Sequence, residues 1–237
     1  MVIEYYSASE IGPRKTNEDY VDCWRTSSDG VVACIADGLG GMGGGDVASK
    51  IAINIFKASL DDKVVDIESM RGAAISAHKA ILEEQKSNIS SRMASTLTAL
   101  YLDDQGIIGV HCGDSRAVIA RGNGIKRLTK DHSEGQRLFD ANKLSKEEFY
   151  NYPRKHILES ALGQHKDPVI DSIKFDLALG DRVILTTDGV YNSVYLKKMR
   201  YFCDVSQTPK SLVNNVFDLV RDSKPSDNYS MIALYVE

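Results

Sequence analysis

The sequence predicts an α+β fold in which antiparallel strands and helices form separate blocks. Two apolar segments, 94–101 and 106–112, and a predicted hairpin, 117–129, follow one another with only turns between them. This close succession indicates an antiparallel meander, because parallel strands need long crossover connections. The polar segment 131–165 then has a helical pattern, and we expect it to form an insertion over the core.

Length and composition predict one domain over residues 1–237, with enough apolar side chains for a core, since 43% of the residues are hydrophobic. The formal charge is −4 and like charges form no block, which argues against nucleic-acid and membrane-surface partners. No signal peptide or membrane-length apolar run occurs. The four cysteines lack metal-site spacing, so we expect reduced thiols and a cytoplasmic protein.

The first third of the chain predicts three strands and two helices. Strands are expected at 2–8 and 20–24, and the unbroken apolar run 31–36 predicts a buried strand that ends at Asp37. Helical spacing follows from Asp46, which we expect to be an N-cap, and continues in a second helix at about 66–88.

The glycine-rich loop after Asp37 admits three interpretations. Gly38 to Gly43 matches the G-x-G-x-x-G pattern of dinucleotide sites, between a predicted strand and a predicted helix. Alternatively, Asp37 is a metal ligand and the loop surrounds a metal site, which fits better because a carboxylate there would repel a pyrophosphate. The third interpretation is a turn in which Asp37 acts as a cap. This stretch alone does not separate them.

The remaining chain predicts further strands and helices. The meander has turns at 103–106 and 122–124, and the segment 131–165 contains a capping box from Ser145 to Glu148. We expect strands at 168–176, 181–187 and 229–236, with helices at about 195–203 and 209–222. The histidines of 131–165 are not at metal-ligand spacing, and we expect them to be surface or packing residues.

Four aspartates stand at the boundaries of predicted strands: Asp37, Asp114, Asp188 and Asp227. Each alone fits a turn residue, but together they can converge, and such a cluster would repel itself without cations. Oxygen ligands without cysteine or convergent histidine favour Mg²⁺ or Mn²⁺. Paired cations typically serve phosphoryl chemistry, and Arg14 could hold a phosphate or form only a surface ion pair.

The order of these motifs resembles the metal-dependent protein phosphatases of the 2C type, and the resemblance spans nearly the whole chain. The motifs are R-x-x-N-E-D, D-G-x-G-G, G-D-S-R, D-G and D-N, found here at Arg14–Asp19, Asp37–Gly41, Gly113–Arg116, Asp188-Gly189 and Asp227-Asn228. The resemblance implies a four-layer α-β-β-α sandwich of two antiparallel sheets flanked by helices, as in compact bacterial members.

The resemblance also implies two tightly bound metal ions, Mn²⁺ or Mg²⁺. Asp37 would bridge them, with Asp188 and Asp227 on the first. Glu18, mostly through water, and the Gly38 carbonyl would serve the second.

A third, weaker metal would lie on Asp114, and Asp188 would be shared with it. Arg14 matches the phosphate-binding arginine, Asp19 would support metal-bound water, and 131–165 matches the mobile flap. Leu39 stands where some relatives carry a histidine proposed as general acid, and leucine cannot donate a proton.

The implied activity is hydrolysis of phosphoserine and phosphothreonine on proteins, by a metal-bridged water that attacks phosphorus in line. Phosphorylated proteins would be the substrates, a cytosolic serine/threonine kinase would oppose the enzyme, and we expect a monomer. Two other functions stay open, a catalytically silent phosphoprotein-binding module and a nucleotide-binding enzyme.

Overall fold

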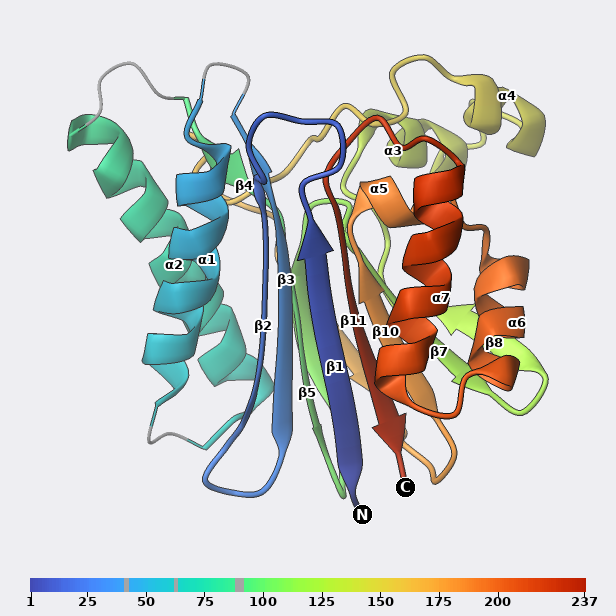
Figure 1. Ribbon diagram of the computed structural model, residues 1–237. Helices are drawn as coiled ribbons and strands as arrows, with labels where there is room; N and C mark the ends of the chain where they lie inside the picture. The colour runs from blue at the N-terminus through green and yellow to red at the C-terminus, as the bar shows by residue number, and fades with distance from the viewer. Residues whose placement is uncertain (41–42, 62–63, 88–91) are drawn as a thin grey trace.

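The computed structural model describes residues 1–40, 43–61, 64–87 and 92–237, and they form four layers (Figure 1). Two antiparallel sheets pack face to face, and helices cover the outer face of each sheet. The prediction of an α-β-β-α sandwich is therefore confirmed. Gly41 and Met42 of the glycine loop, and the expected helix end at 88, lie outside the described residues.

One sheet has five strands, and each neighbouring pair is antiparallel. Its order is β1 (Ile3–Glu10), β11 (Tyr229–Val236), β10 (Arg182–Thr186), β7 (Arg116–Arg121) and β8 (Gly124–Arg127). The last strand of the chain thus lies between the first strand and β10, which brings both chain ends to one edge of the sandwich (Figure 1).

The other sheet contains the predicted meander. Its order is β2 (Asp19–Arg25), β3 (Val31–Leu39), β5 (Leu97–Asp103), β6 (Gly106–Cys112) and β9 (Asp171–Phe175), with the short β4 (Ala94–Ser95) paired to β3. The strand expected at 94–101 is therefore broken at Thr96. The break has a function in the site, because the Thr96 hydroxyl accepts a hydrogen bond from the Asp37 backbone.

The strand β3 is apolar from Val31 to Ala36 because both of its faces are buried there. Val31, Ala33 and Ile35 pack between the two sheets. Val32 and Cys34, on the opposite face, pack against the helices α1 (Gly45–Leu60) and α2 (Ile67–Ser87). A strand covered on both faces loses the usual polar–apolar alternation, which explains its unbroken apolar run.

The second helical layer covers the five-stranded sheet. It contains α5 (Asp188–Tyr191), α6 (Leu196–Val205) and α7 (Pro209–Asp222), which pack on β10 and β11 around a second core. The helix α7 begins at the predicted residue, where Thr208 and Ser211 form a capping box and a proline occupies the first turn.

The segment 131–165 contains α3 (Glu134–Asp140) and α4 (Lys146–Asn151), which lie above β7 and α5 (Figure 1). The predicted capping box from Ser145 to Glu148 is present. Much of the remaining segment is not helical, so its polar pattern overstated the helix content.

Three local predictions were wrong. Asp37 lies inside β3, which continues to Leu39, because Gly38 and Leu39 still pair with β4. Asp46 is not an N-cap, because α1 starts one residue earlier and Gly44 caps it in a left-handed conformation with φ 95°. The four-residue α5 was missed because one helical turn gives no periodic signal.

No helix among the described residues is long and apolar enough to cross a lipid bilayer.

Candidate functional site

The predicted acidic residues gather at one edge of the sandwich, the upper edge in Figure 1. The strands β3, β6 and β10 end at this edge, and β2, β7 and β11 begin there. Antiparallel pairing places their flanking residues together. We call these residues the carboxylate centre: Glu18, Asp19, Asp37, Asp114, Asp188 and Asp227.

Asp37 lies among four other acids of the carboxylate centre. Its backbone N–H donates to Thr96 Oγ1 at 2.8 Å, which fixes its position in β3. Burial and then the nearby charges of Asp19, Asp188, Asp114 and Asp227 raise the pKa of the Asp37 carboxyl well above its usual range.

Asp19 stands directly opposite Asp37 in the β2–β3 pairing, although like charges in such cross-strand pairs are destabilising. Its Oδ2 accepts hydrogen bonds from Thr187 Oγ1 at 2.8 Å and from Ser230 Oγ at 2.6 Å. Ser230 lies in β11 of the other sheet, and Thr187 directly follows β10 of that sheet. Asp19 therefore ties the two sheets together beneath Asp37, while burial raises its pKa to about 7 against these hydrogen bonds.

Asp188 and Asp227 adjoin neighbouring strands of the five-stranded sheet. Burial, followed by the charge of Asp227, raises the pKa of Asp188 to about 6. Gly189 must be glycine because a Cβ there would lie 2.0 Å from the Asn228 carbonyl oxygen. This close approach explains the D-G motif and brings the two aspartates side by side.

Asp114 lies in the turn between β6 and β7, buried among charged and aromatic groups. Tyr191 Oη donates to Asp114 Oδ2 at 3.3 Å. Burial, Asp188 and Asp131 together raise the Asp114 pKa to about 8. Asp114 thus joins the carboxylate centre to a second charged cluster around Asp131.

Glu18 and Gly38 meet where β3 leads toward α1. The Gly38 N–H donates to the Glu18 carbonyl at 3.0 Å, and a Cβ at Gly38 would lie 2.0 Å from the Gly45 carbonyl oxygen. The Glu18 carboxylate accepts a hydrogen bond from the Gly45 backbone at the start of α1, where the helix dipole favours an anion. Burial and Asp46 nevertheless raise the Glu18 pKa.

Arg14 lies on the exposed side of the carboxylate centre. Its Nη2 is 2.6 Å from Asp227 Oδ2, and its Nε donates to the Ser226 carbonyl at 3.1 Å. The guanidinium is about half exposed, since 53% of the side chain is accessible. The ion pair considered from the sequence therefore exists, and its partner is a member of the carboxylate centre.

The donor set fits a hard divalent cation, because it consists of carboxylate and carbonyl oxygens without thiolate or imidazole. Cations would also relieve the repulsion that raises the pKa values of these acids. No three acidic, histidine or cysteine side chains in the described ranges are arranged to hold one ion as they stand. Asp227 is ion-paired with Arg14, and Asp19 accepts hydrogen bonds from two hydroxyls. A carboxylate engaged in such a contact would have to give it up, at least in part, to bind a cation.

Sequence reasoning gave no role to several residues that build this edge. Asn228 is the most connected. Its Oδ1 accepts from the Glu18 N–H at 2.9 Å, and its Nδ2 donates to the carbonyls of Ile11 and Thr16 at 2.7 and 3.0 Å. The sequence feature that could have identified Asn228 is its position directly after Asp227 in the D-N motif. Thr187 stands directly before the D-G motif and could have been identified in a similar way. No sequence feature pointed to Thr96.

Comparison with known proteins gives the same picture of fold and family. The family model described as protein phosphatase 2C matches residues 8–216. The protein phosphatase PhpP of Streptococcus pneumoniae is 29% identical over 221 residues, which cover 90% of this chain and 88% of the relative.

Two solved structures place the fold among serine/threonine phosphatases. The Mycobacterium tuberculosis phosphatase PstP/Ppp superposes with a TM-score of 0.89 at 26% identity, covering 100% of both chains. The catalytic domain of a phosphatase PstP in complex with two manganese ions gives 0.84 at 26% identity, covering 99% of both.

The fold and the family match define a phosphoprotein phosphatase. The chain belongs to the protein phosphatase 2C family, because the family model covers most of its length.

Proposed function

We propose that this protein hydrolyses phosphoserine and phosphothreonine on proteins at the carboxylate centre. The observation that carries the proposal is the convergence of six acidic residues from five motifs on one strand edge, with Arg14 at its exposed side. Membership of the protein phosphatase 2C family supports the reaction class.

Two divalent cations, Mn²⁺ or Mg²⁺, fit the centre, and we assign their ligands from the motif order. Asp37, Asp188 and Asp227 would hold the first, and Asp37, Glu18 and the Gly38 carbonyl the second.

A weaker third cation would use Asp114 together with Asp188. When bound, such cations acidify water and neutralise charge on phosphoryl oxygens.

The protein's own groups would orient the substrate and the ligands. The planar fork of Arg14 can form two hydrogen bonds to a phosphoryl group, which positions phosphorus for in-line attack without a covalent intermediate. Thr187 and Ser230 fix the Asp19 carboxylate, which would support water beside the cations. Leu39, the last residue of β3, supplies no proton for the leaving group.

The direct test is phosphate release from a phosphoserine peptide by chelated protein and by protein reloaded with Mn²⁺. We expect no turnover after chelation and recovery with the metal. Full turnover in metal-free buffer would overturn the metal assignment. Mn²⁺ binding without hydrolysis of any phosphopeptide or of p-nitrophenyl phosphate would favour the silent binding module.

The nucleotide-binding alternative loses support from the topology. A dinucleotide site requires a parallel β-α-β unit, whereas β3 pairs with β2, β4 and β5 only in antiparallel fashion. A thermal-shift comparison of NAD with Mn²⁺ tests this, and stabilisation by NAD alone would restore the alternative.

We further propose the biological setting expected from the sequence. Phosphorylated proteins are the substrates, a serine/threonine kinase opposes the enzyme, and the enzyme acts as a cytoplasmic monomer formed by one domain. The four cysteines are free thiols, which suits a reducing compartment. The segment 131–165 would act as a flap that selects among protein substrates.

A further inference from the structure

A cavity of about 460 Å³ lies next to the carboxylate centre. The segment 131–165 forms one wall, and β7 with the region from α5 to α6 forms the other. Asp114 of the carboxylate centre and Thr186, the last residue of β10, also line this cavity. The cavity therefore shares Asp114 with the carboxylate centre, so a substrate bound at the centre would lie beside it.

The charge of the cavity is opposite to that of the centre. Its basic lining groups are Arg116, Arg127, Lys155 and Lys197, and its acidic ones are Asp114 and Asp131. The lining is thus net basic even when both aspartates are ionised. Metal ions on the centre would neutralise Asp114 and make the excess larger.

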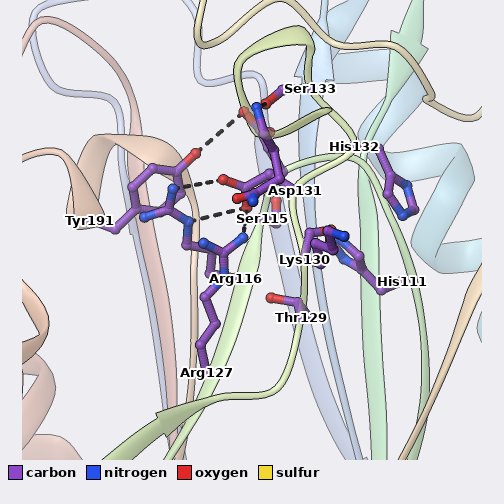
Figure 2. Close-up of polar contacts among 12 residues, drawn as sticks. His111, Ser115, Arg116, Arg127, Thr129, Lys130, Asp131, His132, Ser133 and Tyr191 are labelled. Atoms are coloured by element: carbon purple, nitrogen blue, oxygen red, sulfur yellow. Dashed lines mark hydrogen bonds and ion pairs between the residues drawn. The ribbon is translucent and has the colours of Figure 1, made fainter. Parts of the chain in front are cut away.

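Asp131 cannot neutralise both arginines. It accepts two bonds from Arg116, at 3.2 and 2.7 Å, and another from Arg127, so one carboxylate serves two guanidinium groups (Figure 2). Arg127 Nε is buried and finds no hydrogen-bond partner among the described residues. Tyr191 stacks on Arg116 at 3.6 Å and holds it in place.

The two lysines come from opposite walls of the cavity. Lys197 is exposed at the start of α6 and forms no ion pair within the described part of the chain. On the other wall, Lys155 Nζ donates to the Tyr150 carbonyl at 2.7 Å, a contact within the segment 131–165. One basic group from each wall thus faces the same space.

We propose that this cavity is a secondary subsite that binds an anionic side chain of the substrate protein, flanking the phosphoresidue at the carboxylate centre. The anion is a carboxylate or a second phosphate, since both pair with guanidinium and ammonium groups. The inference rests on the proposed function and adds a rule of substrate choice to it.

The experiment compares phosphoserine peptides that differ only at flanking positions. Aspartate, alanine, leucine, lysine or a non-hydrolysable phosphonate analogue of phosphoserine is placed on each side in turn. We measure kcat/KM with Mn²⁺, and p-nitrophenyl phosphate reports the centre without any flanking residue. A charge-assisted bond is worth about a tenfold to hundredfold preference, so we expect that gain for aspartate over alanine at one or more positions.

The variant Lys197→Glu should remove this preference and improve the lysine-flanked peptide, with turnover of p-nitrophenyl phosphate unchanged. Lys155→Gln provides a second, milder change on the other wall. The matched control is Lys79→Glu, the same charge reversal at an exposed lysine of α2 in the other helical layer.

Gains that both vary with the flanking charge and depend on Lys197 support the subsite, and a larger gain from the phosphonate than from aspartate identifies phosphate as the preferred anion. Equal kcat/KM for all flanking residues would overturn the subsite and leave the proposed function intact. A leucine preference that survives Lys197→Glu would also overturn it. Failure of every peptide with the wild-type protein would instead count against the proposed function.

Discussion

Two clusters of buried charge meet at Asp114, and they differ in how their charges are balanced. In the carboxylate centre, burial and four neighbouring acids raise the pKa of Asp37 well above its usual range. Around Asp131, acids and bases alternate, and although burial opposes the charge of Arg116, its bonds to Asp131 raise the Arg116 pKa. Figure 2 shows this second cluster, with Arg116 and Arg127 directed at the same carboxylate.

The difference separates an all-acidic site that needs cations from a mixed cluster that supports the fold, and the positive charge left over in the mixed cluster is the charge assigned above to the anion subsite. Buried ionic groups that compensate one another can hold a fold together without any ligand. Buried groups of one sign leave a deficit that a ligand of the opposite sign can fill. Substitutions in the two clusters should therefore have opposite effects on stability and activity.

The largest expected effect is the loss of activity in Asp37→Asn. Metal ligation contributes several kcal/mol to phosphoryl chemistry, so we expect turnover with Mn²⁺ to fall by at least about 10³-fold. The metal-free variant should be more stable than the wild type, because burying an ionisable carboxyl among four other acids costs free energy that a neutral amide does not cost. Phosphopeptide turnover and thermal unfolding in chelator measure the two effects.

Asp104→Asn provides the matched control for that variant, because Asp104 lies in an exposed turn. It should change neither quantity. Retained activity in Asp37→Asn, or a metal-free form less stable than the wild type, would contradict the distinction between the clusters.

The second effect concerns Asp131→Ala. This change leaves Arg116 and Arg127 largely buried without their shared carboxylate, and breaking such a pair costs about 3–5 kcal/mol. Urea unfolding in chelator should show the loss, while calorimetry should still find Mn²⁺ binding. Asp140→Ala removes the more exposed ion pair with Lys130 and should cost only about 0–1 kcal/mol. Equal losses in the two variants would mean that the Asp131 cluster does not support the fold.

The third effect is the pH dependence of the metal-free protein. The folded-state pKa values are raised to about 7 for Asp19 and about 8 for Asp114, so folding favours their protonated forms. Stability that is present at low pH is then lost as the pH rises through these values. His111 acts in the opposite sense. Burial lowers its pKa to about 4, so its contribution to the unfolding free energy increases with pH, and this increase is complete above about pH 6.5.

We therefore expect the metal-free protein to lose about 2 kcal/mol of unfolding free energy between about pH 6.5 and 8.5. Saturating Mn²⁺ should flatten or reverse this trend. Urea unfolding at several pH values measures both curves. A metal-free protein whose stability rises across this range would show that the aspartates are not mutually repelling.

The sequence predicted the carboxylate centre better than the Asp131 cluster, for a physical reason. Acidic residues at strand ends leave a local signal, since each follows or precedes an apolar run and two of them, Asp37 and Asp188, stand directly before a glycine. Arg127 and Asp131 carry no such mark, and Arg116 was noted only as the last residue of the G-D-S-R motif, because the pairing of the three depends on how the chain leaves the hairpin β7–β8 and turns into the segment 131–165. His132, expected only as a surface or packing residue, packs on buried His111 with ring centroids 4.8 Å apart.

One of the two predicted caps, the capping box from Ser145 to Glu148, is present, and the other, the N-cap at Asp46, is not. The run 31–36 was recognisable because its two faces pack against different layers, and the helix 209–222 carried a proline and a capping box at its start. The start of α1 was misplaced because a left-handed glycine at Gly44 replaces the side-chain cap, and one glycine among several gives no sign of that conformation.

The smallest expected effect concerns Arg14, which is the one basic side chain ion-paired to the carboxylate centre in the described part of the chain. If its fork binds phosphate, Arg14→Ala should raise KM for a phosphopeptide and the inhibition constant of phosphate by about tenfold, a typical value for a charge-assisted bond. Lysine should restore only part of this, since it lacks the planar fork. Mn²⁺ affinity should stay the same or increase, because Asp227 loses a competing partner.

Lys15→Ala, which removes a neighbouring exposed charge, should change none of these quantities. Unchanged KM and unchanged phosphate inhibition in Arg14→Ala would show that Arg14 only forms a surface ion pair and does not bind phosphate.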